Sequence, residues 1–230
     1  MKKFLSILLT AIVLFGVTGC FGKKTSDPRE EKLEIKGNVK INYLILVNGD
    51  NKLPDTYEDM LKSQLEEATN AWGDTIKVEK ETLKKYNELK EAMAKEGVEI
   101  LLDSGYRSVK EQQEVWDDFE KKYGIEYTKN TVAVPWYSEH HTGLAIDIVI
   151  KKDGVLIEEN EDMIAEREIF AKIHEKLADY GFILRYPEGK KDITGYNYEP
   201  WHFRYVGSAS KAKEIKDSGL TFDEYMSEKE

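Results

Sequence analysis

Apolar residues along the chain follow two spacings, which predict a mixture of strands and helices. The β-branched run over residues 41–47 ends at Asn48-Gly49-Asp50, which predicts a strand followed by a turn. The Asp153-Gly154 pair predicts a hairpin that returns through residues 155–157. Other short apolar runs predict strands over residues 98–102, 145–150, 182–186 and 201–206.

Helical spacing of apolar residues, together with end signals, predicts the helices. One set of apolar residues precedes Gly97 and another precedes Gly181, which predicts two helices that each end at a glycine. The pairs Ser108 with Glu111 and Thr221 with Glu224 have the spacing of capping boxes, so each predicts a helix start. The residues behind these predictions are Leu83, Tyr86, Leu89, Met93, Trp116, Phe119, Phe170, Ile173 and Leu177.

The order of these elements predicts the fold class. Strands and helices are interspersed, but the Asp-Gly hairpin favours antiparallel pairing, so we expect an α+β fold. The chain has 230 residues, which fits one compact domain with a small central antiparallel sheet flanked by helices. We assign this domain to residues 37–230.

The N-terminal residues predict export. Lys2 and Lys3 precede an apolar run over residues 4–17 that is shorter than a membrane span, and Thr18-Gly19 lead to Cys20. This pattern resembles a bacterial lipoprotein signal. We expect a signal peptide over residues 1–19, a lipid on Cys20 and a flexible spacer over residues 20–36. An uncleaved anchor is the alternative, and both place the protein outside the cytoplasmic membrane of a bacterium.

Charge and cysteine content narrow the possible partners and metal sites. The net charge of −10 and the pI of about 5.1 oppose binding to nucleic acid or to an anionic membrane surface, so we expect membrane contact through the lipid only. No protein partner is implied. With one cysteine, the chain forms no internal disulfide and no four-thiolate metal site. A metal would have to bind to histidine and carboxylate.

Two pairs of residues offer such ligands. His140 lies seven residues before Asp147, which interrupts an apolar strand, and Glu199 lies three residues before His202. Two imidazoles and a carboxylate make a three-ligand catalytic zinc site that leaves a fourth position for water, and a nearby glutamate acts as general base. The spacing alone leaves an alternative open, in which these are hydrogen-bonded structural side chains.

Three ordered segments stand out: Ser-Gly-Tyr-Arg-Ser over residues 104–108, Ser-Glu-His-His-Thr-Gly-Leu-Ala-Ile-Asp-Ile over 138–148, and Tyr-Glu-Pro-Trp-His-Phe-Arg-Tyr-Val-Gly over 198–207. Together they resemble the motifs of VanY-type zinc D-alanyl-D-alanine carboxypeptidases. Segments 46–48, 53–54 and 180–187 support the match, so the resemblance covers about residues 40–226. It implies a zinc site in a cleft over the sheet.

The resemblance also implies roles for individual residues. His140, Asp147 and His202 are the implied zinc ligands, and Glu199 is the implied catalytic base and acid. Arg107 matches an arginine that steadies the oxyanion or the substrate carboxylate, and a planar guanidinium suits either one. The implied substrate contacts include two further positions, Gln112 and Ser138, although each can equally cap a helix or turn.

The loop before Ser138 departs from the family, because Trp136-Tyr137 stand where relatives often carry glycine. We hypothesise that these aromatics form a wall for the substrate. The side chain of the third stem-peptide residue is expected to contact Gln112, Trp136 or Tyr186. Four further side chains are expected to take no direct part in metal binding or catalysis. His141 is expected to point away from the site, His174 to be structural, and Trp201 and Phe203 to pack behind the metal site.

The activity implied by the resemblance is removal of the C-terminal D-alanine from peptidoglycan stem peptides. D-alanyl-D-alanine ends are the first expectation, and an L,D-carboxypeptidase acting on stem tetrapeptides is the close alternative. A non-catalytic peptide-binding lipoprotein would not need a base beside a metal ligand. An endopeptidase that cuts crossbridges is a further alternative.

Overall fold

The computed structural model describes residues 40–229 of the chain. The strands are β1 Leu65–Thr69, β2 Thr75–Glu79, β3 Glu99–Ser104, β4 Ala145–Lys152, β5 Val155–Ile157, β6 Phe182–Leu184 and β7 His202–Tyr205. The α-helices are α1 Tyr57–Leu61, α2 Lys80–Lys95, α3 Val109–Tyr123, α4 Ile125–Thr131, α5 Asn160–Ala165, α6 Arg167–Leu177, α7 Lys191–Thr194, α8 Ala209–Ser218 and α9 Phe222–Ser227. Short 3-10 helices are η2 Lys62–Gln64, η3 Glu139–Thr142 and η4 Ala178–Tyr180.

The central sheet is antiparallel throughout. Its strand order is β3-β4-β7-β6, and β5 pairs with the end of β4 as the predicted hairpin. Strands β1 and β2 form a separate two-stranded sheet. These pairings confirm the α+β class with a small antiparallel sheet.

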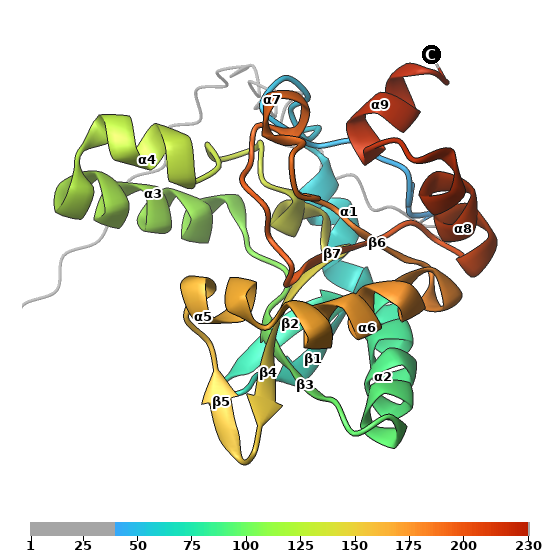
Figure 1. Ribbon diagram of the computed structural model, residues 1–230. Helices are drawn as coiled ribbons and strands as arrows, with labels where there is room; N and C mark the ends of the chain where they lie inside the picture. The colour runs from blue at the N-terminus through green and yellow to red at the C-terminus, as the bar shows by residue number, and fades with distance from the viewer. Residues whose placement is uncertain (1–39, 230) are drawn as a thin grey trace, which may run out of the picture. The chain divides into compact units, whose positions relative to one another are not determined.

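Helices α2 and α6 pack against the central sheet and bury its apolar face (Figure 1). The predicted glycine end of α6 is present, because Gly181 follows η4 in the left-handed conformation. Both predicted capping boxes are also present, at Ser108 before α3 and at Thr221 before α9. Each of these helices therefore begins where its sequence signal lies.

The strand predicted over residues 41–47 is wrong. Within residues 40–229 this segment pairs with no strand, and the Arg204 side chain donates hydrogen bonds to two of its carbonyls, those of Tyr43 at 3.1 Å and Ile45 at 2.7 Å. Its apolar side chains, including Val47, still enter the core. The segment is apolar because it is buried, and burial alone does not show that a segment pairs with another strand.

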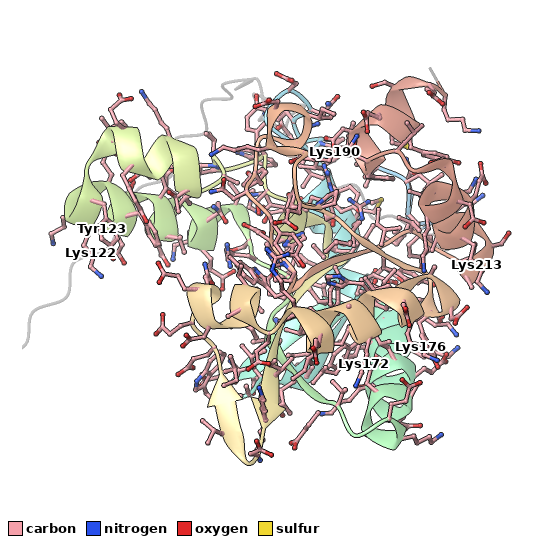
Figure 2. All side chains as sticks on the ribbon, viewed as in Figure 1. Lys122, Tyr123, Lys172, Lys176, Lys190 and Lys213 are labelled. Carbon is pink, nitrogen blue, oxygen red and sulfur yellow. The ribbon has the colours of Figure 1, made fainter. Side chains whose placement is uncertain are left out.

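The predictions for the N-terminal residues lie outside the part of the chain that the structure describes. They are the signal peptide over 1–19, the lipid on Cys20 and the spacer over 20–36, and they stay predictions. Among residues 40–229, no helix is both long and apolar enough to span a bilayer. The outer faces of the helices are charged, as Lys176 of α6 and Lys213 of α8 illustrate (Figure 2).

Candidate metal centre and its cleft

The three predicted zinc ligands come together in the structure, although His140 and His202 lie far apart in sequence. Asp147 of β4 and His202 of β7 are directly opposite each other in the antiparallel register. His140 reaches them from η3, the turn that leads into β4. Strand pairing therefore positions two of these side chains, and the preceding turn positions the third.

The distances between these side chains fit a single metal ion. His140 Nε2 lies 3.1 Å from Asp147 Oδ2, and His202 Nδ1 lies 2.9 Å from Asp147 Oδ1. Tetrahedral zinc with bonds of about 2.0–2.1 Å places its ligand atoms roughly 3.3 Å apart. Asp147 Oδ1 is buried and, among the described residues, has no hydrogen-bond partner of proper geometry despite this short approach. An unpaired buried carboxylate oxygen is costly unless a cation compensates it.

Other polar atoms of these side chains form hydrogen bonds with neighbouring residues. His140 Nδ1 donates to the carbonyl of Gly105 at 2.8 Å, and Ser104 Oγ donates to Asp147 Oδ2 at 2.8 Å. Such contacts fix the tautomer and the ring orientation of a metal ligand. Gly105 has no room for a side chain, because a Cβ atom there would meet the Lys77 carbonyl oxygen at 2.5 Å.

The charges of Asp147, His140 and His202 influence one another strongly. Burial alone would raise the pKa of Asp147, but the His140 and His202 rings hold it well below its usual range. Burial lowers the pKa of His140, whereas Asp147 and Glu139 overcome burial and raise the pKa of His202 to about 10. Binding of a metal would displace a proton from the His202 ring.

Glu199 lies beside this centre in the loop before β7. Its Oε2 atom is 3.9 Å from His202 Nδ1, the same nitrogen that approaches Asp147. Burial raises the pKa of Glu199 to about 7, and His202 opposes this shift. The loop itself is held by His174, whose Nε2 is 2.9 Å from the Pro200 carbonyl oxygen, which agrees with the structural role predicted for that histidine.

A cleft of about 390 Å³ opens over the three predicted ligands. Arg107, Gln112, Ser138 and Glu199 all line it. Gln112 is buried and links its neighbours: its Oε1 accepts from Arg107 Nη1 at 3.0 Å, and its Nε2 donates to the Ala133 carbonyl at 2.7 Å. The predicted substrate-contact residues therefore share one cavity, and Gln112 orients Arg107 within it.

His141 points away from the cleft, as expected. Its Nδ1 is 2.7 Å from the Arg107 carbonyl oxygen, and its Nε2 accepts from the backbone N–H of Trp136 at 3.1 Å. Because burial lowers the pKa of His141, the ring is neutral, as one donor and one acceptor contact require. It ties the backbone of Arg107 to the loop before Ser138.

The hypothesis of an aromatic wall at Trp136-Tyr137 is wrong. Trp136 has a positive φ of 78° and packs in the cluster around Leu53, away from the cleft lining. Tyr137 borders a different pocket. The aromatic side of the cleft is formed by Tyr196 and by Tyr186, whose ring packs against that of His202 with centroids 4.8 Å apart and an interplanar angle of 44°.

Trp201 and Phe203 also differ in part from expectation. Phe203 of β7 is fully buried in the main core, on the opposite face of the strand from His202, as predicted. Trp201 packs in the same core, but one edge of it borders the cleft. It therefore contributes to the wall of the cavity as well as to the packing behind it.

Sequence reasoning missed two acidic residues that line the cleft. Glu139 contacts His202 and two buried arginines, and its position directly before a predicted ligand was the available signal. Asp103 was missed because it lies at a bulge near the end of β3: the β3–β4 register passes from Leu102 to Ser104 and leaves Asp103 unpaired. Burial raises the pKa of Asp103 to about 6, Asp147 adds to this, and Arg107 opposes it.

Two histidines, a largely buried aspartate and an adjacent glutamate in one cleft define the class of the protein as a zinc metallopeptidase. The family model for D-alanyl-D-alanine carboxypeptidase, VanY, matches residues 75–208, more than half of the chain. The chain belongs to this family, and zinc is its cofactor.

Relatives and solved structures agree with the assignment. The putative carboxypeptidase YodJ of Bacillus subtilis (strain 168) is 38% identical over 187 residues, which cover 80% of this chain and 67% of YodJ. The LdcB LD-carboxypeptidase structure has a TM-score of 0.72 and 38% identity, covering 81% of this chain and 86% of that chain. Another similar structure is that of a D,D-pentapeptidase VanY variant from a VanB-type resistance cassette, in complex with Zn(II). It has a TM-score of 0.64 and 33% identity, and the match covers 80% of this chain and 98% of that chain.

Proposed function

We propose that this protein removes the C-terminal D-alanine from peptidoglycan stem peptides, with D-alanyl-D-alanine ends as substrate. The observation that carries the proposal is the placement of the Glu199 carboxylate 3.9 Å from a ring nitrogen of the His140-Asp147-His202 cluster. A base at that position can reach a water molecule held beside the metal. The similarity to VanY proteins supports D-alanyl-D-alanine as the C-terminal end of the substrate.

His140 Nε2, an Asp147 carboxylate oxygen and His202 Nδ1 would hold the zinc ion. When bound, zinc supplies a Lewis acid that polarises the scissile carbonyl and lowers the pKa of a water molecule. Glu199 then takes a proton from the attacking water and delivers it to the amine of the departing D-alanine as the C–N bond breaks. Arg107, oriented by Gln112, receives the oxyanion or the terminal carboxylate.

A muropeptide digest read by mass spectrometry tests this proposal. The zinc-loaded protein, incubated with stem pentapeptides, is expected to shorten them by one alanine and to release free D-alanine. A chelator is expected to stop the reaction, and added zinc to restore it. Intact pentapeptides after incubation with the zinc-loaded protein would refute D,D activity, and cleavage inside the stem would indicate an endopeptidase.

Asp103 favours a second candidate function, L,D-carboxypeptidase activity on stem tetrapeptides. In that reaction the residue that contributes the scissile carbonyl is lysine, whose side chain ends in an amine, or diaminopimelate, whose side chain ends in an amine and a carboxylate. In the D,D reaction the corresponding side chain is a methyl group. A cleft carboxylate among like charges, which include Asp147 and Glu158, gains most from an ammonium partner.

The Asp103→Asn substitution is expected to separate the two substrates. It should lower kcat/KM for a lysine tetrapeptide by about tenfold, the factor expected for one charged hydrogen bond, and leave the pentapeptide rate nearly unchanged. In the unsubstituted protein, the preference for the lysine substrate should fade as the pH drops through about 6, because Asp103 then becomes neutral. A tetrapeptide with acetylated lysine is the control, since it has no ammonium. An equal effect on acetylated and free lysine would contradict this role.

We also propose that the protein is attached to the outer face of the bacterial membrane by a lipid on Cys20. The support is the sequence pattern of residues 1–20, a short apolar segment that follows two lysines and ends at the cysteine. The Cys20→Ser variant is expected to lose the lipid mass and to leave the membrane fraction. Retention of that variant in the membrane would instead support an uncleaved anchor.

A further inference from the structure

Glu139 is a buried carboxylate with two cationic partners. Its side chain is 1% exposed, and its Oε1 accepts from Arg185 Nε at 2.7 Å and from Arg204 Nη1 at 2.8 Å. Both arginine side chains are fully buried. Contact with two guanidinium groups favours the ionised form of this carboxylate.

The charge network continues to the C-terminal helix. Arg185 also forms a two-point ion pair with Asp223 of α9, in which Nη2 donates to Oδ1 at 3.0 Å and Nη1 donates to Oδ2. Asn48 Nδ2 donates to the same aspartate at 2.7 Å. Two carboxylates thus balance two guanidinium groups, and the network ties α9 to the turn that contains Glu139.

The second oxygen of Glu139 faces a predicted metal ligand. Glu139 Oε2 lies 3.4 Å from His202 Nε2, whereas the other ring nitrogen, Nδ1, approaches Asp147. Glu139 therefore contacts the His202 ring on the side opposite to the metal position. Arg204 lies two residues after His202 in β7, so both side chains project from the same face of the strand toward Glu139.

Stability alone does not account for this arrangement. Desolvation of several charges is expensive, and apolar residues of similar volume stabilise a core at least as well as a buried ion pair. A buried carboxylate that touches the rear nitrogen of an imidazole has a known physical effect: it fixes the tautomer and orientation of the ring and raises its basicity.

We propose that Glu139 is the positioning residue for His202, held in place by Arg185, Arg204 and Asp223, so that the C-terminal helix α9 sets the geometry of the metal centre. The 3-10 turn η3 then supplies both a predicted ligand, His140, and the support for the other histidine. This inference rests on the proposed role of His202 as a zinc ligand. It assigns to Glu139 no contact with the substrate.

The test compares metal binding by the unchanged protein and by its Glu139→Gln variant. We expect the zinc dissociation constant, measured by chelator competition, to rise by about 10- to 100-fold. The visible absorption bands of the cobalt-substituted protein should shift, because the ligand field of the ion changes with the His202 ring. The matched control is Glu96→Gln after α2, an exposed glutamate that pairs with Lys176 on the surface, which should change neither quantity.

A second variant separates positioning from simple destabilisation. Glu139→Gln leaves a buried excess of positive charge, whereas the double variant Glu139→Gln/Arg204→Gln restores the balance. The double variant is expected to regain thermal stability in the metal-free state and still to bind zinc weakly. If zinc affinity returns together with stability, or if folded Glu139→Gln binds zinc as the unchanged protein does, the inference is wrong.

The same experiment distinguishes this inference from the proposed function. Failure of the unchanged protein to bind zinc or to release D-alanine would overturn the proposed function itself. Normal zinc binding and activity in the unchanged protein, with no loss in either Glu139 variant, would overturn only the role of Glu139. Substitution of Asp223 by asparagine should give a smaller loss of zinc affinity, since it loosens Arg185 but leaves Glu139 in contact with His202.

Discussion

Replacement of Glu199 by glutamine is expected to lower D-alanine release by roughly 10²- to 10⁴-fold, the usual contribution of a general acid-base group. The glutamine keeps the size of the side chain but cannot accept the proton from water. Because Glu199 is a proton carrier and not one of the three predicted ligands, zinc content should stay unchanged. Steady-state release of D-alanine and metal analysis of the same sample measure both effects.

The matched control for this variant is Glu188→Gln. Glu188 lies in the same stretch between β6 and β7, but its side chain is 60% exposed and pairs with Arg167 on the surface. Activity of the control should equal that of the unchanged protein. If Glu199→Gln retains full activity with zinc bound, another group transfers the proton and the assignment of Glu199 fails.

The Asp147→Asn substitution is expected to abolish zinc retention and activity together. A carboxamide has no charge with which to neutralise the ion, and the two histidines alone form an incomplete site. The loss of a Lewis acid worth several kcal/mol corresponds to a rate decrease of roughly 10³-fold or more. Metal content after dialysis and D-alanine release from the stem pentapeptide are the two measurements.

Asp153→Asn provides the control for this change on the same strand hairpin. Asp153 is exposed and has a positive φ of 52°, a conformation that asparagine adopts readily. This control should keep its zinc and its activity. Stoichiometric, tightly held zinc in Asp147→Asn would show that the ion is bound elsewhere.

Much of the fold could be predicted because local signals and burial agreed. The apolar run 145–150 with its Asp-Gly turn became β4 and β5, and the capping boxes at Ser108 and Thr221 begin α3 and α9. The β1–β2 hairpin was missed because β1 is largely charged or exposed and shows no apolar alternation, and the alternation in β2 is limited to Ile76 and Val78. Segment 41–47 shows the converse, since it is apolar without being a strand.

The cluster of His140, Asp147 and His202 could be anticipated because the residue types suit zinc and the motif order resembles a known family. The proximity of these residues could not be derived from spacing, since it depends on the pairing of β4 with β7. Asp103 and the partners of Glu139 were beyond sequence reasoning for a similar reason. A bulge in β3 directs Asp103 into the cleft. Contacts between segments distant in sequence bring Arg185, Arg204 and Asp223 into the buried network around Glu139.

Zinc titration of the metal-free protein, with D-alanine release from the stem pentapeptide recorded at each addition, tests the central claim most directly. We predict that release rises in proportion to added zinc and levels off at about one zinc per chain, as one three-ligand site requires. Full activity before zinc is added, or no activity after one equivalent is tightly bound, would contradict the account.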